Sequence, residues 1–136
     1  MAALVIDPEG RALFIRRARE PAKGKLALPG GFIDGGESAE EALRREIHEE
    51  VGLRVGQLEY LGSWPNRYPT PSGEVDVCDL FFEARTENTE TKNGVEEVAE
   101  IIWMDPKEVR LDDLAFVSMC AAVTTFLKRG TANERK

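Results

Sequence analysis

A helix whose start and end are both marked can be predicted from residues 38–52. Ser38 and Glu41, three positions apart, match the capping box, in which each side chain bonds the backbone of the other residue. Gly52 lies where a helix commonly ends, because glycine readily adopts the left-handed conformation. The apolar residues between these ends recur at helical spacing: Leu43, Ile47 and Val51. The chain must therefore contain a helix that packs one face against a core.

The same helix carries acidic residues beside its apolar stripe. At about 100° per residue, Glu46, Glu49 and Glu50 share an arc of about 100°. Like charges at this spacing repel, and the helix dipole disfavours anions near the C-terminal end. A hard divalent cation reverses this cost, since Mg²⁺ binds carboxylate and phosphate oxygens. A charged face exposed to water is the alternative interpretation.

The segment that leads into this helix is rich in glycine. Residues 30–36 contain four glycines in seven positions. Such a segment lets backbone amides and carbonyls approach a ligand without obstruction by side chains. A tight turn would explain the glycines equally well. Together with the acidic helix, however, the segment predicts a site for a metal-bound anion.

Strands and helices alternate along the rest of the chain, which predicts an α/β or α+β layered domain. Strands are expected at residues 2–6, 12–16, 26–28, 58–62, 75–84 and 98–104. The first two are expected to form a hairpin around the turn at 7–10, where proline and glycine favour a turn. Residues 63–73 contain three of the seven prolines and are expected to form a loop with little backbone pairing.

One domain is expected to fill residues 1–130. Its last helix is predicted to begin at Asp112 or Asp113 and to end at Gly130. Residues 131–136 are expected to be a frayed polar tail.

Charge and composition restrict the partners of this domain. The 25 acidic residues outnumber the 18 basic ones, which gives a net charge of −7 and argues against broad nucleic-acid binding or a basic membrane anchor. No apolar run approaches the roughly 20 residues that a membrane span needs, and the start lacks the pattern of a signal peptide. The two cysteines form no CxxC motif and are expected to be reduced. We therefore expect a cytoplasmic protein that binds neither nucleic acid nor membranes.

The glycine segment and the acidic helix together resemble the Nudix box, GX5EX7REUXEEXGU, where U is a bulky aliphatic residue. Gly31, Glu37 and the run 45–53 match every fixed position, with Ile47 and Leu53 as the aliphatic residues. The likeness extends from the first hairpin to the final helix. This resemblance implies the Nudix fold, a mixed β-sheet between helices. It also implies hydrolysis of a diphosphate linkage in a nucleoside diphosphate joined to a further group, X.

The resemblance also implies roles for individual residues. Mg²⁺, or Mn²⁺ in its place, is expected to be held by Glu46, Glu49, Glu50 and the backbone carbonyl of Gly30. Arg45 and Glu37 correspond to residues that orient this acidic cluster. The general base varies within the family, and the candidates are Glu49, Glu50 or an acid of a distant loop. That loop carries Glu96, Glu97 and Glu100, of which Glu97 is a further candidate metal ligand.

Two partial resemblances bear on the substrate. The segment from Ser63 resembles the SQPWPFPxS element of NADH pyrophosphatases at three positions: Ser63, Pro65 and Pro69. It departs at Trp64, Asn66 and Arg67, and the chain lacks the cysteines of that subfamily's zinc ribbon. Many ADP-ribose pyrophosphatases carry a proline sixteen residues after the box, which is the place of Pro69. The two resemblances indicate different X groups, so the substrate stays open.

Aromatic and basic side chains outside the box are the candidates for substrate contacts. Trp64 and Tyr68 are expected to stack on a nucleobase or nicotinamide ring, with packing onto the core as the alternative. Arg17 is a candidate for a phosphate contact, and Gly31 for a backbone contact with the substrate.

Other functions of the family remain open from the sequence. A Nudix domain can sense a nucleotide without cleaving it, although a sensor need not keep every metal-binding carboxylate. It can also clear unwanted nucleoside triphosphates. Isomerisation of a diphosphate or removal of an mRNA cap would need residues or a basic path that the sequence does not show. The resemblance also allows a homodimer, and no sequence feature identifies a partner surface.

Overall fold

The computed structural model describes residues 1–134, and the side chains of residues 1–130. Its elements, in chain order, are β1 (Ala2–Ile6), β2 (Ala12–Arg17), β3 (Leu26–Ala27), α1 (Ala39–Val51), β4 (Leu58–Thr70), β5 (Gly73–Arg85), β6 (Val98–Met104), the short 3₁₀ helix η1 (Leu111–Asp113) and α2 (Val117–Glu134). The alternation of strands and helices predicted from the sequence is confirmed.

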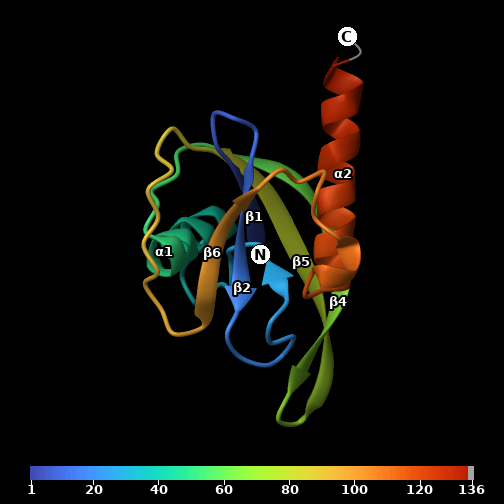
Figure 1. The fold of residues 1–136 in the computed structure, drawn as a ribbon. Coiled ribbons are helices and arrows are strands. Elements are labelled where there is room, and N and C mark those ends of the chain that lie inside the picture. Colours follow the sequence, from blue (N-terminus) through green and yellow to red (C-terminus); the bar gives the residue numbers. More distant parts are fainter. Residues whose placement is uncertain (135–136) are drawn as a thin grey trace.

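The strands form one mixed sheet. Its order is β3-β2-β1-β5-β4, and β6 pairs with β2. The β1–β5 pair is parallel and the other pairs are antiparallel. The predicted hairpin of β1 and β2 is present, with Ile6 opposite Ala12. In Figure 1, α1 and α2 lie on opposite sides of the strands. The expected α+β architecture, a mixed sheet between helices, is therefore correct.

Helix α1 forms as its sequence predicts. The Ser38 hydroxyl accepts from the Glu41 amide at 3.2 Å, and the Glu41 carboxylate accepts from the Ser38 amide at 3.2 Å. Gly52 ends the helix with a φ of 76°. The predicted apolar stripe is fully buried in the core: Leu43, Ile47 and Val51. Burial of this stripe fixes the rotation of the helix, and hence the direction of its acidic face.

The segment predicted to be a proline-rich loop is a strand. β4 continues through it to Thr70 and pairs with β5 along most of its length, with Pro65 opposite Cys78 and Pro69 opposite Glu74. β4 is the edge strand of the sheet, so one side of its backbone has no partner strand. Prolines four residues apart point their missing N–H groups to the same side, and an edge strand tolerates this on its open side. The prediction of a loop was therefore wrong.

The C-terminal helix is shifted relative to its prediction. Asp112 and Asp113 lie in η1, and α2 begins at Val117 and ends at Glu134 rather than at Gly130. The predicted tail thus begins within the helix, and its last two residues, 135–136, lie outside the described part of the chain. Within residues 1–134, no helix has the length and apolar character needed to cross a membrane.

The close contact of Gly30 with β1 leads to a first prediction. Gly30 bridges to Ala2, and a Cβ at Gly30 would lie 2.6 Å from the Cα of Ala2. Gly30→Ala is expected to lower the free energy of unfolding by about 1–3 kcal/mol, because backbone atoms cannot yield as a side chain can. Urea denaturation measures this loss. Gly35→Ala is the matched control, because a Cβ there meets no atom within 4 Å. Equal stability of the two variants would contradict the prediction.

Candidate active site

Glu50 is the buried member of the acidic helix face. Its residue surface is 9% exposed, and its Oε1 accepts the N–H of Gly30 at 2.9 Å. Burial raises the pKa of the Glu50 carboxyl to about 8, although the Gly30 hydrogen bond opposes this shift. The glycine segment and the last turn of α1 are thus joined through this one side chain. At neutral pH and without a cation nearby, the Glu50 carboxyl therefore tends to hold a proton.

Glu46, one turn earlier on α1, packs against the backbone of Gly31. A Cβ at Gly31 would lie 2.6 Å from the carboxyl carbon of Glu46, so glycine at this position lets the carboxylate approach the loop. Burial raises the pKa of the Glu46 carboxyl above its ordinary value, and hydrogen bonding to Arg45 offsets only part of that rise. Two carboxyl groups of α1 therefore meet the backbone of two consecutive glycines.

Arg45 connects the remaining acids of the box. Its Nε and Nη2 donate to the two carboxylate oxygens of Glu37 at 2.7 and 2.9 Å, which is a bidentate pair. Its Nη1 donates to Glu46 at 3.1 Å and to Glu49 at 3.4 Å. The hydrogen bonds from Arg45 lower the pKa of Glu37. This geometry agrees with the expectation that Arg45 and Glu37 orient the acidic cluster.

The planar fork of Arg45 leads to a second prediction. Arg45→Lys is expected to lower kcat/KM by about 10- to 100-fold, because an ammonium group cannot bond Glu37 bidentately while also reaching Glu46 and Glu49. Initial rates with a hydrolysed substrate measure the loss. Arg44→Lys, whose arginine bonds the Gly56 carbonyl, is the control on the same helix. Full activity of Arg45→Lys would contradict the prediction and show that a positive charge at position 45 is enough to orient the acidic cluster.

The donors at this site suit a hard divalent cation. The carboxylates of Glu46 and Glu50 offer oxygen atoms alone, and such ligands favour Mg²⁺ or Mn²⁺ over softer metals. Glu49 is more exposed, with half of its side chain accessible. Within the described residues, no three histidine, cysteine or acidic side chains are grouped closely enough to hold a metal ion. Two carboxylates still fit Mg²⁺, which usually keeps several waters and binds substrate phosphates, and the Gly30 carbonyl stays a predicted ligand.

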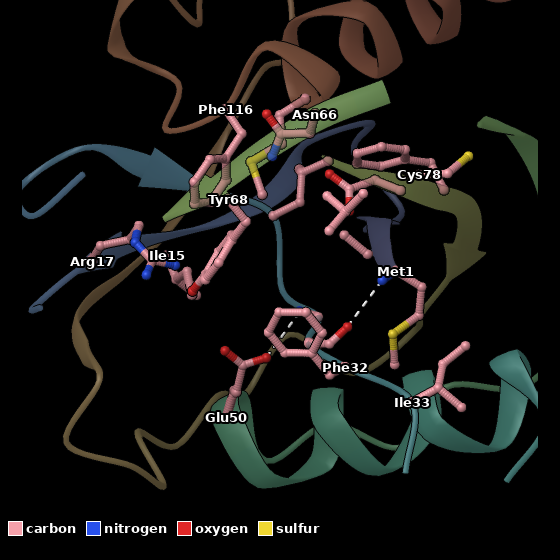
Figure 2. Close-up of a pocket in the computed structure, with 18 residues that line it drawn as sticks. Met1, Ile15, Arg17, Phe32, Ile33, Glu50, Asn66, Tyr68, Cys78 and Phe116 are labelled. Carbon is pink, nitrogen blue, oxygen red and sulfur yellow. Dashed lines mark hydrogen bonds between the residues drawn. The ribbon is translucent and has the colours of Figure 1, made fainter. Parts of the chain in front are cut away.

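A cavity of about 400 Å³ opens beside Glu50. Figure 2 shows the rings of Phe32, Tyr68 and Phe116 around it. The Tyr68 ring lies 5.5 Å from that of Phe32 and 5.7 Å from that of Phe116. The Arg17 guanidinium lies 5.3 Å from the centre of the Phe116 ring. This arrangement suits a ligand with a flat ring and a phosphorylated end.

The structure brings most of the predicted site residues together. Those that line the cavity are Arg17, Gly30, Gly31, Glu50 and Tyr68. Trp64 does not line it: the Trp64 ring packs against Phe81, at 5.8 Å between ring centres, which is the alternative that the sequence left open. Glu97 bonds Arg19 at 3.2 Å, and its negative charge contributes to the raised pKa of Glu50. Glu97 does not line the cavity, and its role as a metal ligand stays a prediction.

Several residues of the cavity were not predicted from the sequence. These are Phe32, Asn66, Asp79 and Phe116. A signal was present for Asn66, because in a strand every second side chain points to the same face. Had residues 63–70 been interpreted as a strand, Asn66 and Tyr68 would have been placed on one face. Asp79 and Phe116 could not be placed in this way, since they come from β5 and from the residue before α2.

An oxygen-donor site beside an aromatic cavity defines a domain suited to phosphorylated ligands, and comparison with known sequences gives its family. A sequence model of the NUDIX domain matches residues 1–119. The chain belongs to the Nudix family, as the box predicted. It is 33% identical over 105 residues to the NAD-capped RNA hydrolase NUDT12 of Homo sapiens, which covers 77% of this chain and 21% of that protein.

Two further relatives carry different names. Over 107 residues the chain is 36% identical to the NAD-capped RNA hydrolase NudC of Mycobacterium bovis, covering 79% of this chain and 32% of that protein. Over 71 residues it is 42% identical to the ADP-ribose pyrophosphatase of Methanocaldococcus jannaschii, covering 52% of this chain and 42% of that protein. The chain therefore spans between about a fifth and about two fifths of the length of these relatives.

Solved structures confirm the fold. The NUDIX domain of Shewanella oneidensis NrtR, solved with ADP ribose, superposes with a TM-score of 0.76 over 94% of this chain and 84% of that one, at 22% identity. The MutT protein of Methanosarcina mazei Go1 gives a TM-score of 0.74 over 95% of this chain and 91% of that one, at 22% identity. At these identities the likeness establishes the Nudix fold alone.

Proposed function

We propose that this chain hydrolyses the diphosphate linkage of a nucleoside diphosphate joined to a further group, with Mg²⁺ or Mn²⁺ as the cofactor. One observation carries the proposal. The carboxyl groups of Glu46 and Glu50 lie against the backbone of Gly30 and Gly31, at the rim of a cavity with aromatic walls. Such a site can bind a diphosphate at the acidic helix and a flat ring in the cavity.

Each part of the site has a role in this proposal. When bound, the divalent cation supplies positive charge that offsets the diphosphate oxygens and makes an attacking water more acidic. Arg45 fixes Glu46 and Glu49 in place through its hydrogen bonds. Glu50 Oε1 is held by the Gly30 amide, which leaves Oε2 to accept the proton of the water. Arg17 lies beside the cavity, where its guanidinium can meet a phosphate oxygen.

The relatives are named for their action on NAD-capped RNA, ADP-ribose or NAD(P)H. These names favour an adenine-containing substrate such as NADH or ADP-ribose, and NAD-capped RNA is a further candidate. A net charge of −7 favours a free dinucleotide or nucleotide-sugar over RNA, because phosphate chains need a basic path. The cavity falls within the usual size range of small-molecule sites, about 300–1,000 Å³. We propose that the protein acts on free nucleotides in the cytoplasm.

A substrate panel tests this function. NADH, ADP-ribose, a short NAD-capped RNA and a nucleoside triphosphate are incubated with the chain and Mg²⁺, and the products are separated by chromatography. We expect AMP from NADH or ADP-ribose and none when EDTA is present. Tight binding of ADP-ribose without turnover in Mg²⁺ or Mn²⁺ would support a nucleotide sensor instead. Faster cleavage of the triphosphate or of the capped RNA would reject the proposed substrate class.

A further inference from the structure

Asn66 is a buried polar residue whose side chain has no hydrogen-bond partner among residues 1–130. Its surface is 7% exposed, it lies on β4 and it lines the cavity. None of the side-chain hydrogen bonds within residues 1–130 involves its amide, and no fully enclosed side-chain nitrogen or oxygen atom lacks a partner there. The Asn66 amide therefore faces the cavity. A buried amide is costly unless it is hydrogen-bonded, so this position indicates a polar ligand atom.

Asp79 lies next to Asn66 on the neighbouring strand. Asn66 is directly opposite Val77, and Asp79 is two residues further along β5, on the same face. Diagonal neighbours of this kind are roughly 7–8 Å apart. The Ser118 hydroxyl donates to Asp79 Oδ2 at 2.6 Å, which fixes the carboxylate. The Met1 ammonium attracts the Asp79 carboxylate from the same cavity, but no described residue donates a hydrogen bond to Asp79 Oδ1, so this oxygen can accept one from a ligand.

Asn66, Asp79 and the Glu50 end of the acidic helix all line the same cavity. In the view of Figure 2, Asn66 and Glu50 lie on opposite sides of the cavity, with the ring of Tyr68 between them. A phosphorylated end at Glu50 would direct the base past Tyr68 and toward Asn66. The polar groups that meet the base edge are then an amide, which both donates and accepts, and a carboxylate, which accepts.

We propose that Asn66 and Asp79 recognise the 6-amino group of an adenine ring in this cavity. The inference rests on the proposed function and adds the specificity for the base. One amino hydrogen is donated to Asn66 Oδ1, while Asn66 Nδ2 donates to the adjacent ring nitrogen of adenine. The second amino hydrogen is donated to Asp79 Oδ1. Amide recognition of adenine through an amino group and a ring nitrogen is a common pairing in nucleic-acid complexes.

Hypoxanthine is the base that tests this arrangement most directly. It has the shape of adenine but carries a carbonyl oxygen in place of the amino group. That oxygen would face Asp79 Oδ1 with no hydrogen between them, and two acceptors in contact repel. An amide alone could rotate to suit either base, because it offers both a donor and an acceptor. Discrimination between the two bases should therefore depend mainly on Asp79.

Binding of ADP-ribose and its hypoxanthine analogue, IDP-ribose, measures the discrimination. Isothermal calorimetry is done without divalent cations, so that neither ligand is cleaved, and kcat/KM is measured separately with Mg²⁺. We expect the wild-type chain to bind ADP-ribose about 10- to 100-fold more tightly than IDP-ribose. Asn66→Ala should weaken binding of ADP-ribose by about tenfold.

Asp79→Asn should reverse the preference. Its new amide can still accept from the Ser118 hydroxyl through its oxygen, while its nitrogen donates to the carbonyl of hypoxanthine. Arg67→Ala is the matched control, since Arg67 is the next residue on β4, is exposed, and pairs with Glu74 and Asp76 outside the cavity. This variant should keep the wild-type preference. Thermal melting shows that each variant is folded.

The outcomes separate this inference from the function on which it rests. A preference for ADP-ribose without any hydrolysis would reject the proposed enzyme and keep the base specificity. Hydrolysis of both ligands with equal affinity in the wild-type chain would reject the base specificity and keep the enzyme. An unchanged preference in folded Asp79→Asn would also overturn the inference.

Discussion

Glu50→Gln is expected to lower kcat by about 10²- to 10⁴-fold. The glutamine oxygen can still accept the N–H of Gly30, so the backbone contact is kept. The Glu50 Oε2 atom, however, is replaced by an amide nitrogen, which can neither accept a proton nor bind a cation. Steady-state rates with the best substrate of the panel, at saturating Mg²⁺, measure this change.

Glu40→Gln is the control for this variant. Glu40 is an exposed residue in the first turn of the same helix, and the substitution makes the same change of charge. It should retain wild-type activity. Glu50→Gln with near-wild-type activity would refute the assignment of Glu50, and the general base would then have to be Glu49 or an acid of the 96–100 loop.

Stability should fall with rising pH because of the same carboxyl group. The pKa of Glu50 is raised to about 8 in the folded chain, against an ordinary value of 4.5 in the unfolded chain. Between these two pH values the unfolded chain releases the proton and the folded chain keeps it, so rising pH favours unfolding. Above the pKa that Glu50 has in the folded chain, both states have released the proton, and this contribution to stability is lost completely. A shift of this size corresponds to about 3–5 kcal/mol.

Urea denaturation in EDTA at several pH values from about 5 to about 8.5 measures this dependence. The glutamine of Glu50→Gln cannot ionise, so this variant should lack the fall in unfolding free energy that Glu50 causes as pH rises. The difference in unfolding free energy between the variant and the wild-type chain should therefore grow with pH, in favour of the variant. A constant difference between the two proteins over this range would contradict the raised pKa. Added Mg²⁺ should reduce the difference, because a bound cation favours the ionised carboxylate.

Local patterns in the sequence were sufficient to predict helix α1 and to identify the Nudix box. Ser38, Glu41 and Gly52 act on backbone groups a few residues away, so they define the helix without any knowledge of the fold. The acidic face follows from helical spacing, because burial of the apolar stripe fixes how the helix is rotated. The contact of Glu50 with Gly30 joins the last turn of α1 to the glycine segment 20 residues earlier.

Tertiary structure decided what surrounds that motif. Prolines at 65 and 69 predicted a loop, yet they lie in a strand because β4 is at the sheet edge, and an edge can be identified only once the strand order is known. Trp64 and Tyr68 lie on the same face of β4, four residues apart, yet Trp64 packs on Phe81 whereas Tyr68 lines the cavity. The pairing of β4 with β5 also brings Asn66 close to Asp79.

The sequence by itself therefore determined the helix, its acidic face and the family, because short-range spacing along the chain specifies all three. The walls of the cavity, and the groups proposed to select the base, come from β4, β5 and the start of α2. Pairing between strands and packing of a helix across them depend on residues far apart in the chain, and no local pattern encodes those contacts.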